Sequence, residues 1–143
     1  MADVSRSVIV GHTPAEMFAL VDAVEAYPEF LPWCGEARVI HRDETVTRAT
    51  LHIAYRGIRQ TFTTENAKRA PEEMRVHLVE GPFRSLDGVW RFTALGPGGC
   101  KIEFRLSYEF SSKWLEKLIG PVFDHIAGSL VAAFVRRADS IHG

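Results

Sequence analysis

The chain has 143 residues, a length that suits one domain with a sizeable hydrophobic core, so residues 1–143 are expected to form a single domain. Its apolar fraction of 46% and charged fraction of 24% are ordinary for a soluble globular protein. The formal net charge of −1 excludes a strong overall attraction to nucleic acid or anionic lipid, although a local basic patch could still bind either.

The cysteines and the N-terminal residues bear on where the protein works. Cys34 and Cys100 do not make a disulfide framework, and the first residues contain no apolar signal core. No stretch reaches the roughly 18 to 20 uninterrupted apolar residues of a membrane span. We therefore expect a cytoplasmic protein with reduced thiols, soluble or at most peripheral on the inner face of the membrane.

The N-terminal region predicts a strand and then a capped helix. The segment Val4–Val10 is short and β-branched, as strands are. Thr13 can cap a helix that has Pro14 at its first position and Glu16 closing a capping box. The helix is expected to end at about Val24. Its apolar side consists of Met17, Phe18, Leu20 and Val21.

The run Tyr27–Cys34 places three aromatic residues, one leucine and two prolines in eight positions. Prolines fix φ and remove backbone donors, so the run should be neither part of one long helix nor a central strand. A connection this rigid and apolar should be buried against something or be ready to bury something. It is therefore a plug that closes one end of the domain, a gate over an apolar cavity, or a loop that touches a membrane.

Beyond this run the hydrophobic period changes to two, which predicts an antiparallel sheet with one wet face and one covered face. Strands are expected at 49–55, 58–65, 74–78, 86–92 and 100–110, with His52 and His77 on the wet face. The last strand alternates most cleanly. Its covered face consists of Cys100, Ile102, Phe104, Leu106, Tyr108 and Phe110.

Four polar residues fall in register with apolar neighbours on the covered face: Tyr55, Gln60, Glu80 and Tyr108. A buried polar group needs a partner, so each should make an internal hydrogen bond or lie where the face reaches water. The alternative is that these groups line an apolar cavity and fix the polar end of a lipophilic ligand.

The C-terminal region predicts a long apolar helix. Ser111 or Ser112 can cap a helix over about 113–140, which is roughly 40 Å long and could cross a curved sheet from end to end. The pair Gly120-Pro121 should kink or divide it. The order is strand, helix, short helix, five or six strands and long helix, an α+β fold with the sheet bent around the last helix. The apolar stripe of that helix consists of Leu115, Leu118, Ile119, Val122, Ile126, Leu130 and Phe134.

The sequence shows no signature of catalysis or metal binding. No histidines are spaced as metal ligands, and the Gly-x-Ser-x-Gly and phosphate-loop motifs are absent. We therefore expect no metal, no required cofactor and no enzymatic activity. Glu80 and Tyr108 would be the only acid–base candidates for a cyclase-type reaction.

The outer face of the predicted sheet is mildly basic. It is either a solvated face of mixed charge or a contact surface for anionic lipid or RNA phosphates, and we expect no DNA partner. Its acidic residues are Glu65, Asp87, Glu103 and Glu109. Its basic residues are Arg48, Arg59, Arg75, Arg91, Lys101 and Arg105.

Two motifs resemble those of the coenzyme Q-binding START-domain family, part of the polyketide cyclase/lipid-transport superfamily. They are Tyr27-Pro-x-Phe30-Leu-Pro-Trp33-Cys34 and Gly81-Pro-Phe83-Arg-x-Leu86-x-Gly88-x-Trp90-x-Phe92. The resemblance extends over essentially the whole chain. It implies a helix-grip fold, in which an antiparallel sheet grips a long C-terminal helix around an apolar cavity.

The same resemblance implies binding of ubiquinone or a similar isoprenoid lipid, in support of respiratory electron transfer, with transient contact to the inner membrane surface. Bacterial members of the family are also labelled ribosome association toxin RatA. That label implies an alternative, a toxin–antitoxin component that binds the large ribosomal subunit and blocks subunit association. The mildly basic sheet face would be the candidate surface for this contact.

The resemblance also assigns candidate ligand-binding residues by position. The cavity entrance would consist of Tyr27, Phe30, Leu31, Pro32 and Trp33. The sheet side would contribute Phe83, Leu86 and Trp90. The helix side would contribute Val122, Phe123, Ile126 and Leu130. To these we add three residues of the covered sheet face, Tyr55, Phe104 and Tyr108.

Overall fold

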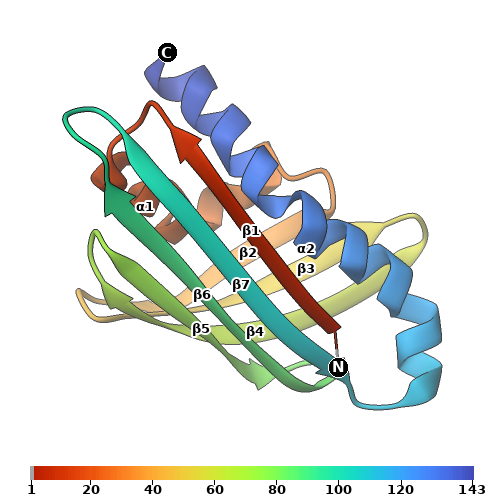
Figure 1. The fold of residues 1–143 in the computed structure, drawn as a ribbon. Coiled ribbons are helices and arrows are strands. Elements are labelled where there is room, and N and C mark those ends of the chain that lie inside the picture. The colour runs from red at the N-terminus through yellow and green to blue at the C-terminus, as the bar shows by residue number, and fades with distance from the viewer. Residues whose placement is uncertain (1) are drawn as a thin grey trace.

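The computed structural model describes residues 2–143 as one seven-stranded antiparallel sheet curved around a long helix (Figure 1). The helices are α1 (Pro14–Asp22), the 3-10 helix η1 (Val24–Glu29) and α2 (Lys113–His142). The strand order is β1-β7-β6-β5-β4-β3-β2, which confirms the expected α+β helix-grip architecture. The strands are β1 (Ala2–Val10), β2 (Cys34–Arg42), β3 (Val46–Tyr55), β4 (Ile58–Arg69), β5 (Glu73–Glu80), β6 (Phe83–Ala94) and β7 (Cys100–Phe110).

The start of α1 matches the prediction, and its end does not. The Glu16 amide donates to Thr13 Oγ1 at 3.1 Å, and the Thr13 amide donates to Glu16 Oε1 at 2.8 Å, which completes the capping box. The helix ends at Asp22, and the chain tightens into η1, which contains Pro28. The first three residues of the proline–aromatic run therefore form the end of this 3-10 helix.

Helix α2 is one continuous element. Ser112 caps it, because its Oγ accepts a hydrogen bond from the Leu115 amide at 3.1 Å. Pro121 does not divide the helix, although Figure 1 shows the first turns at an angle to the remainder. By length and composition alone α2 could cross a membrane, but one of its sides forms the core of this fold. That side includes Ile119, Phe123, Ile126, Val131 and Phe134.

Two differences from the predicted sheet have the same cause. Strand β2 was not assigned from the pattern, because register shifts at Cys34/Glu36 and Val39/His41 break its alternation. Glu80 was expected on the covered face, and this was wrong, because its side chain is exposed. A shift in the β4–β5 register pairs Thr63 with Glu80 but Thr64 with Leu78. A bulge reverses the side on which the following residues point, and alternation alone does not reveal it.

Candidate functional site

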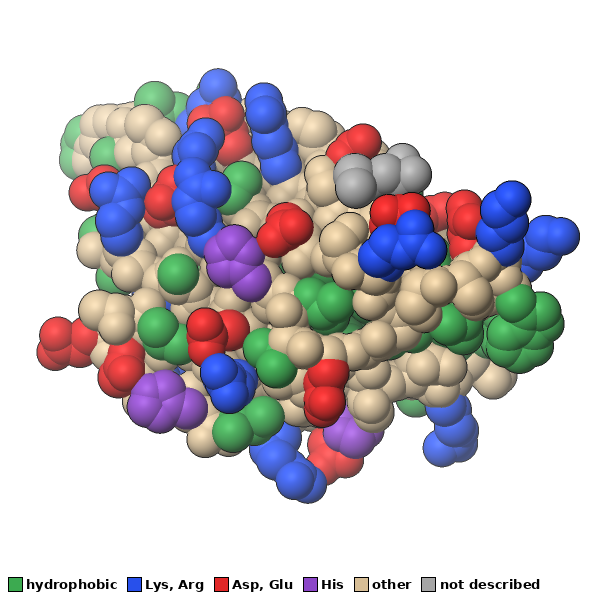
Figure 2. All heavy atoms as spheres, turned by 90° about the horizontal axis from the view of Figure 1, so that it is seen from below, with side chains coloured by type: hydrophobic (Ala, Val, Ile, Leu, Met, Phe, Trp, Pro, Cys, Tyr) green, Lys and Arg blue, Asp and Glu red, His purple; other side chains and the backbone are tan. Residues whose placement is uncertain are grey.

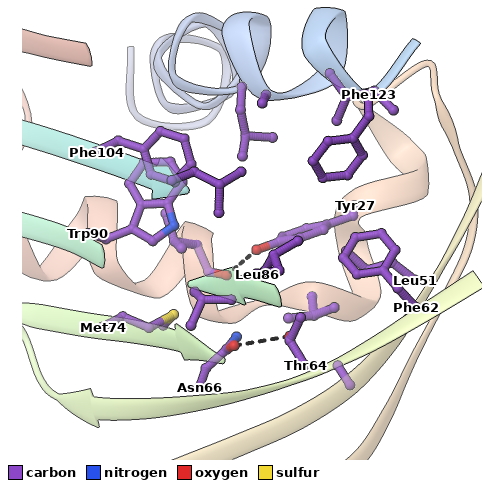
Figure 3. Close-up of a pocket in the computed structure, with 18 of the residues that line it drawn as sticks. Tyr27, Leu51, Phe62, Thr64, Asn66, Met74, Leu86, Trp90, Phe104 and Phe123 are labelled. Carbon is purple, nitrogen blue, oxygen red and sulfur yellow. Dashed lines mark hydrogen bonds between the residues drawn. The ribbon is translucent and has the colours of Figure 1, made fainter. Parts of the chain in front are cut away.

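An apolar cavity of about 90 Å³ lies between the concave sheet face and α2 (Figure 3). Its walls come from α1, η1, the residue just before β2, strands β3 to β7 and α2. Within the described chain, no charged side chain lines it. Tyr27, Thr64 and Asn66 are its polar residues apart from the two indole rings of Trp33 and Trp90.

The structure brings eight of the predicted ligand-binding residues to this cavity. They are Tyr27, Trp33, Leu86, Trp90, Phe104, Phe123, Ile126 and Leu130. They come from η1, the segment before β2, strands β6 and β7, and α2, so segments far apart in sequence converge on one space. Seven others do not line it: Phe30, Leu31, Pro32, Tyr55, Phe83, Tyr108 and Val122.

The proline–aromatic run forms part of the cavity wall through Tyr27 and Trp33. The Tyr27 hydroxyl donates a hydrogen bond to the Val21 carbonyl, and burial raises the pKa of this phenol. The Tyr27 ring packs edge-on against Phe134 at 5.4 Å between centroids. Leu31 is 1% exposed within the core, whereas Pro32 faces solvent. Within the run, the buried residues are thus Tyr27, Leu31, Trp33 and Cys34, and the exposed ones are Pro28, Glu29 and Pro32.

Phe30 lies outside the cavity wall and joins the run to α2. Its ring packs edge-on against Phe134 at 5.3 Å, and the guanidinium of Arg137 lies 5.0 Å above it. Arg137 also forms an ion pair with Glu29 at 2.8 Å. These contacts hold the end of η1 against the last turns of α2.

The remaining predicted residues pack beside the cavity. Phe83 contacts Phe123 in an aromatic cluster, with centroids 4.8 Å apart, and Val122 is partly buried on α2. Tyr108 donates a hydrogen bond to Asp124, so it has the internal partner that its buried position required. Burial, this hydrogen bond and the Asp124 charge raise its pKa. Tyr55 stacks on His125 at 5.8 Å.

Thr64 and Asn66 are site residues that we did not single out from the sequence. Both are 6% exposed on the inner face of β4, and Thr64 Oγ1 donates to Asn66 Oδ1 at 3.1 Å. The signal was present, since the alternation that places Phe62 and Thr64 on the covered face also places Asn66 there. Asn66 was missed because the predicted strand ended at residue 65.

The structure offers little reactive chemistry near the cavity. Burial raises the pKa of the Cys34 thiol to about 11 and raises that of Cys100, so both thiols are poor nucleophiles. Within residues 2–143, no group of three or more His, Cys, Asp or Glu side chains could hold a metal ion. Neither acid–base candidate lines the cavity, since Glu80 is exposed and Tyr108 donates its hydrogen bond to Asp124 beside it.

Basic and acidic side chains are interspersed on the face shown in Figure 2. Arg48 pairs with Glu65 at 2.7 Å, and Arg75 and Arg91 both pair with Glu73. Among the residues that the structure describes, the predicted outer-face residues Arg59, Lys101 and Arg105 take part in no ion pair. These three cations of the predicted outer face remain available to a polyanion.

Comparison with known proteins gives matches over the whole chain. The family described as "Polyketide cyclase / dehydrase and lipid transport" matches residues 10–135. The chain is 41% identical to the ribosome association toxin RatA of Vibrio cholerae, over 100% of this chain and 99% of that protein. It is 29% identical to the mitochondrial coenzyme Q-binding protein COQ10 homolog B of Xenopus laevis, over 97% of this chain and 59% of that protein.

Solved structures share the same architecture. An 18 kDa protein from Caulobacter crescentus is 32% identical, with a TM-score of 0.74 and coverage of 100% of this chain and 99% of that one. The Zhui aromatase/cyclase from a Streptomyces species has a TM-score of 0.84 at 13% identity, covering 96% of this chain and 93% of that one. At that identity the similarity concerns the fold alone.

Proposed function

The chain belongs to the polyketide cyclase/dehydrase and lipid-transport family, and on that premise we propose that it binds ubiquinone or a related isoprenoid quinone between the sheet and α2. The apolar cavity is the observation that carries this proposal. Burial of apolar surface contributes roughly 25 cal/mol per Å², so an isoprenoid tail could supply on the order of 10 kcal/mol before binding costs. The protein would act as a non-catalytic carrier or chaperone in support of respiratory electron transfer. The coenzyme Q-binding relative supports this choice of ligand.

Ligand entry requires the cavity to grow. Its volume of about 90 Å³ is well below the roughly 300–1,000 Å³ of typical ligand sites. The walls best able to move are η1 and α2, because both pack on the sheet through side chains, whereas the end of the proline–aromatic run is fixed to β3 by the hydrogen bond from the Ala54 amide to the Trp33 carbonyl at 2.9 Å. We propose that this run acts as both plug and gate, closing the pocket and opening to admit a tail.

We place the membrane contact at the first turns of α2. Trp114 is 69% exposed and Leu118 is 44% exposed, one turn apart. Lys113 and Lys117 lie beside them and form no ion pair with any described residue. An exposed tryptophan next to lysines suits the interface of an anionic bilayer. In this proposal the cytoplasmic protein docks transiently on the inner face of the membrane.

Vesicle flotation tests that contact. The wild-type chain should float with vesicles of phosphatidylcholine and phosphatidylglycerol, and flotation should fall with added salt. The Trp114→Ser/Leu118→Ser variant should stay at the bottom of the gradient. The control is Val79→Ser, which removes an apolar side chain that is 46% exposed on β5. Equal flotation of wild type and the α2 variant would place the contact elsewhere.

Quinone binding can be tested with delipidated protein and a short-chain ubiquinone, followed by tryptophan fluorescence and melting temperature. Ala127→Met should block binding, because Ala127 lines the cavity and is 1% exposed. Ala132→Met, on the exposed side of the same helix, is the matched control. The proposal fails if wild-type protein shows neither signal and if extracts of protein from its own host contain no lipid.

A second candidate function is binding to the large ribosomal subunit. The support is the 41% identity to one protein named ribosome association toxin RatA and the 37% identity to another from Escherichia coli. Co-sedimentation across a salt series tests it. Arg59→Glu/Arg105→Glu should abolish co-sedimentation, and Ala127→Met should leave it unchanged. If the charge reversals have no effect, the sheet face is not the contact surface.

A further inference from the structure

Two buried residues of the sheet direct hydrogen-bond donors into the cavity. Asn66 is 6% exposed and Trp90 is 4% exposed, and both line the cavity. Figure 3 shows the Asn66 amide and the indole nitrogen of Trp90 directed toward the enclosed space. Asn66 Oδ1 accepts the Thr64 hydroxyl proton at 3.1 Å. Among the residues that the structure describes, Asn66 Nδ2 and Trp90 Nε1 donate to no protein acceptor.

The sheet register sets these donors on opposite sides of the cavity floor. Asn66 on β4 pairs with Val76 on β5, and Val76 pairs with Gly88 on β6, two residues before Trp90. Two strand spacings separate β4 from β6, or roughly 10 Å. A ligand between them can therefore meet one donor on each side.

The cavity offers no charge to a ligand. No described residue that lines it is ionisable except Tyr27, whose pKa is raised by burial. Lys68 lies two residues beyond Asn66 on β4, but its Nζ is held by Asp22 at 3.1 Å. An ionised carboxylate or phosphate would lose its hydration here without gaining a free cation, which is costly.

We propose that the cavity selects neutral lipids whose polar end carries carbonyl oxygens, which accept hydrogen bonds from Asn66 Nδ2 and Trp90 Nε1. This rests on the proposed function and narrows its ligand class. Carbonyl oxygens only accept, and the unpartnered groups of the wall only donate, so the two sets are complementary. Quinones meet this requirement, whereas fatty acids and phospholipid headgroups do not.

The test compares three probes that share one alkyl tail: a ubiquinone, an alkylbenzene and a fatty acid. Wild-type protein should bind the quinone most tightly and the fatty acid most weakly. Asn66→Leu and Trp90→Phe should each weaken quinone binding about threefold to tenfold, the range expected for one hydrogen bond. Binding of the alkylbenzene should not fall. Ile102→Val, at a buried residue of β7 that does not line the cavity, is the matched control.

Infrared spectroscopy provides a second readout. The carbonyl stretch of bound quinone should lie below its position in hydrocarbon solvent, and each donor variant should move it back toward that position. If Asn66→Leu does not fold, the comparison of Trp90→Phe with wild type is enough to test the proposal.

The outcomes separate the two proposals. If no probe binds wild-type protein, the proposed function fails. If the quinone binds wild type and both donor variants equally, or the fatty acid binds as tightly as the quinone, this inference is overturned and the cavity remains a lipid site.

Discussion

The Nζ of Lys68 lies 3.1 Å from Oδ2 of Asp22, and this ion pair ties the end of α1 to β4. The Lys68 side chain is 5% exposed and that of Asp22 is 19% exposed. Thr47 Oγ1 donates to the other Asp22 oxygen at 2.8 Å, and Arg42 donates to the Asp22 carbonyl at 2.6 Å. Because η1 begins two residues after Asp22, this network anchors the start of η1 beside the cavity.

Removing the carboxylate should therefore be costly. Asp22→Asn leaves the Lys68 charge buried without a counter-charge, and we expect a loss of about 3–5 kcal/mol in the free energy of unfolding. The double variant Asp22→Asn/Lys68→Met should lose less than the sum of the single variants, as measured by urea unfolding. The exposed pair Arg48–Glu65 is the control, with an expected coupling below about 1 kcal/mol. Additive losses at Asp22 and Lys68 would show that the two are not coupled.

Truncating Phe123 should turn the small cavity into a ligand site. Phe123 is 3% exposed and lies 4.7 Å from Tyr108 between ring centroids, so Phe123→Ala should lose about 3–5 kcal/mol. The enlarged apolar space should then admit benzene, which a cavity of about 150 Å³ is known to hold. Benzene should raise the melting temperature of the variant but not of wild type. An equal rise in both would mean that the benzene acts elsewhere.

The fall in the free energy of unfolding at acid pH should depend on Glu73. Burial tends to raise the pKa of Glu73, but the hydrogen bond from Arg91 and the charges of Arg75 and Arg69 outweigh it and hold the pKa below its usual range. The depressed pKa stabilises the fold above the carboxyl's ordinary pKa, and this contribution is lost as the pH falls through the folded value. Glu73→Gln should reduce that fall in unfolding measured from pH 7 to pH 3. An unchanged slope would contradict the assignment.

The fall in the free energy of unfolding at alkaline pH should depend on Cys34. Burial raises the pKa of its thiol from 9.0 to about 11, so this contribution to stability is complete below pH 9 and is lost as the pH rises toward 11. Cys34→Ala should reduce the loss over that interval. At pH 8 the folded thiol should react with iodoacetamide about a hundredfold more slowly than in urea, because it carries little thiolate. Similar rates in both conditions would show that the segment opens readily.

Local patterns predicted much of this fold. The capping box at Thr13 and Glu16 involves contacts within one turn, and β7 alternates without interruption, so neighbouring residues are enough to specify both. Strand β2 and the orientation of Glu80 were missed, because each depends on a bulge set by pairing with another strand. The site was predicted in part for the same reason. Trp90 and Ile126 follow from period and motif, whereas Asn66 lies beyond the predicted end of its strand.

The sequence alone determined that a one-sided sheet faces a long apolar helix, since periods of two and 3.6 residues are properties of the local chain. It also identified Tyr27–Cys34 as a rigid apolar run that is a plug, a gate or a membrane-touching loop. Only the tertiary structure decided that Tyr27 and Trp33 turn inward while Pro32 faces solvent. It likewise decided that Asp22 meets Lys68, 46 residues away in sequence. Such relationships depend on strand register and packing between distant segments, and no local periodicity contains them.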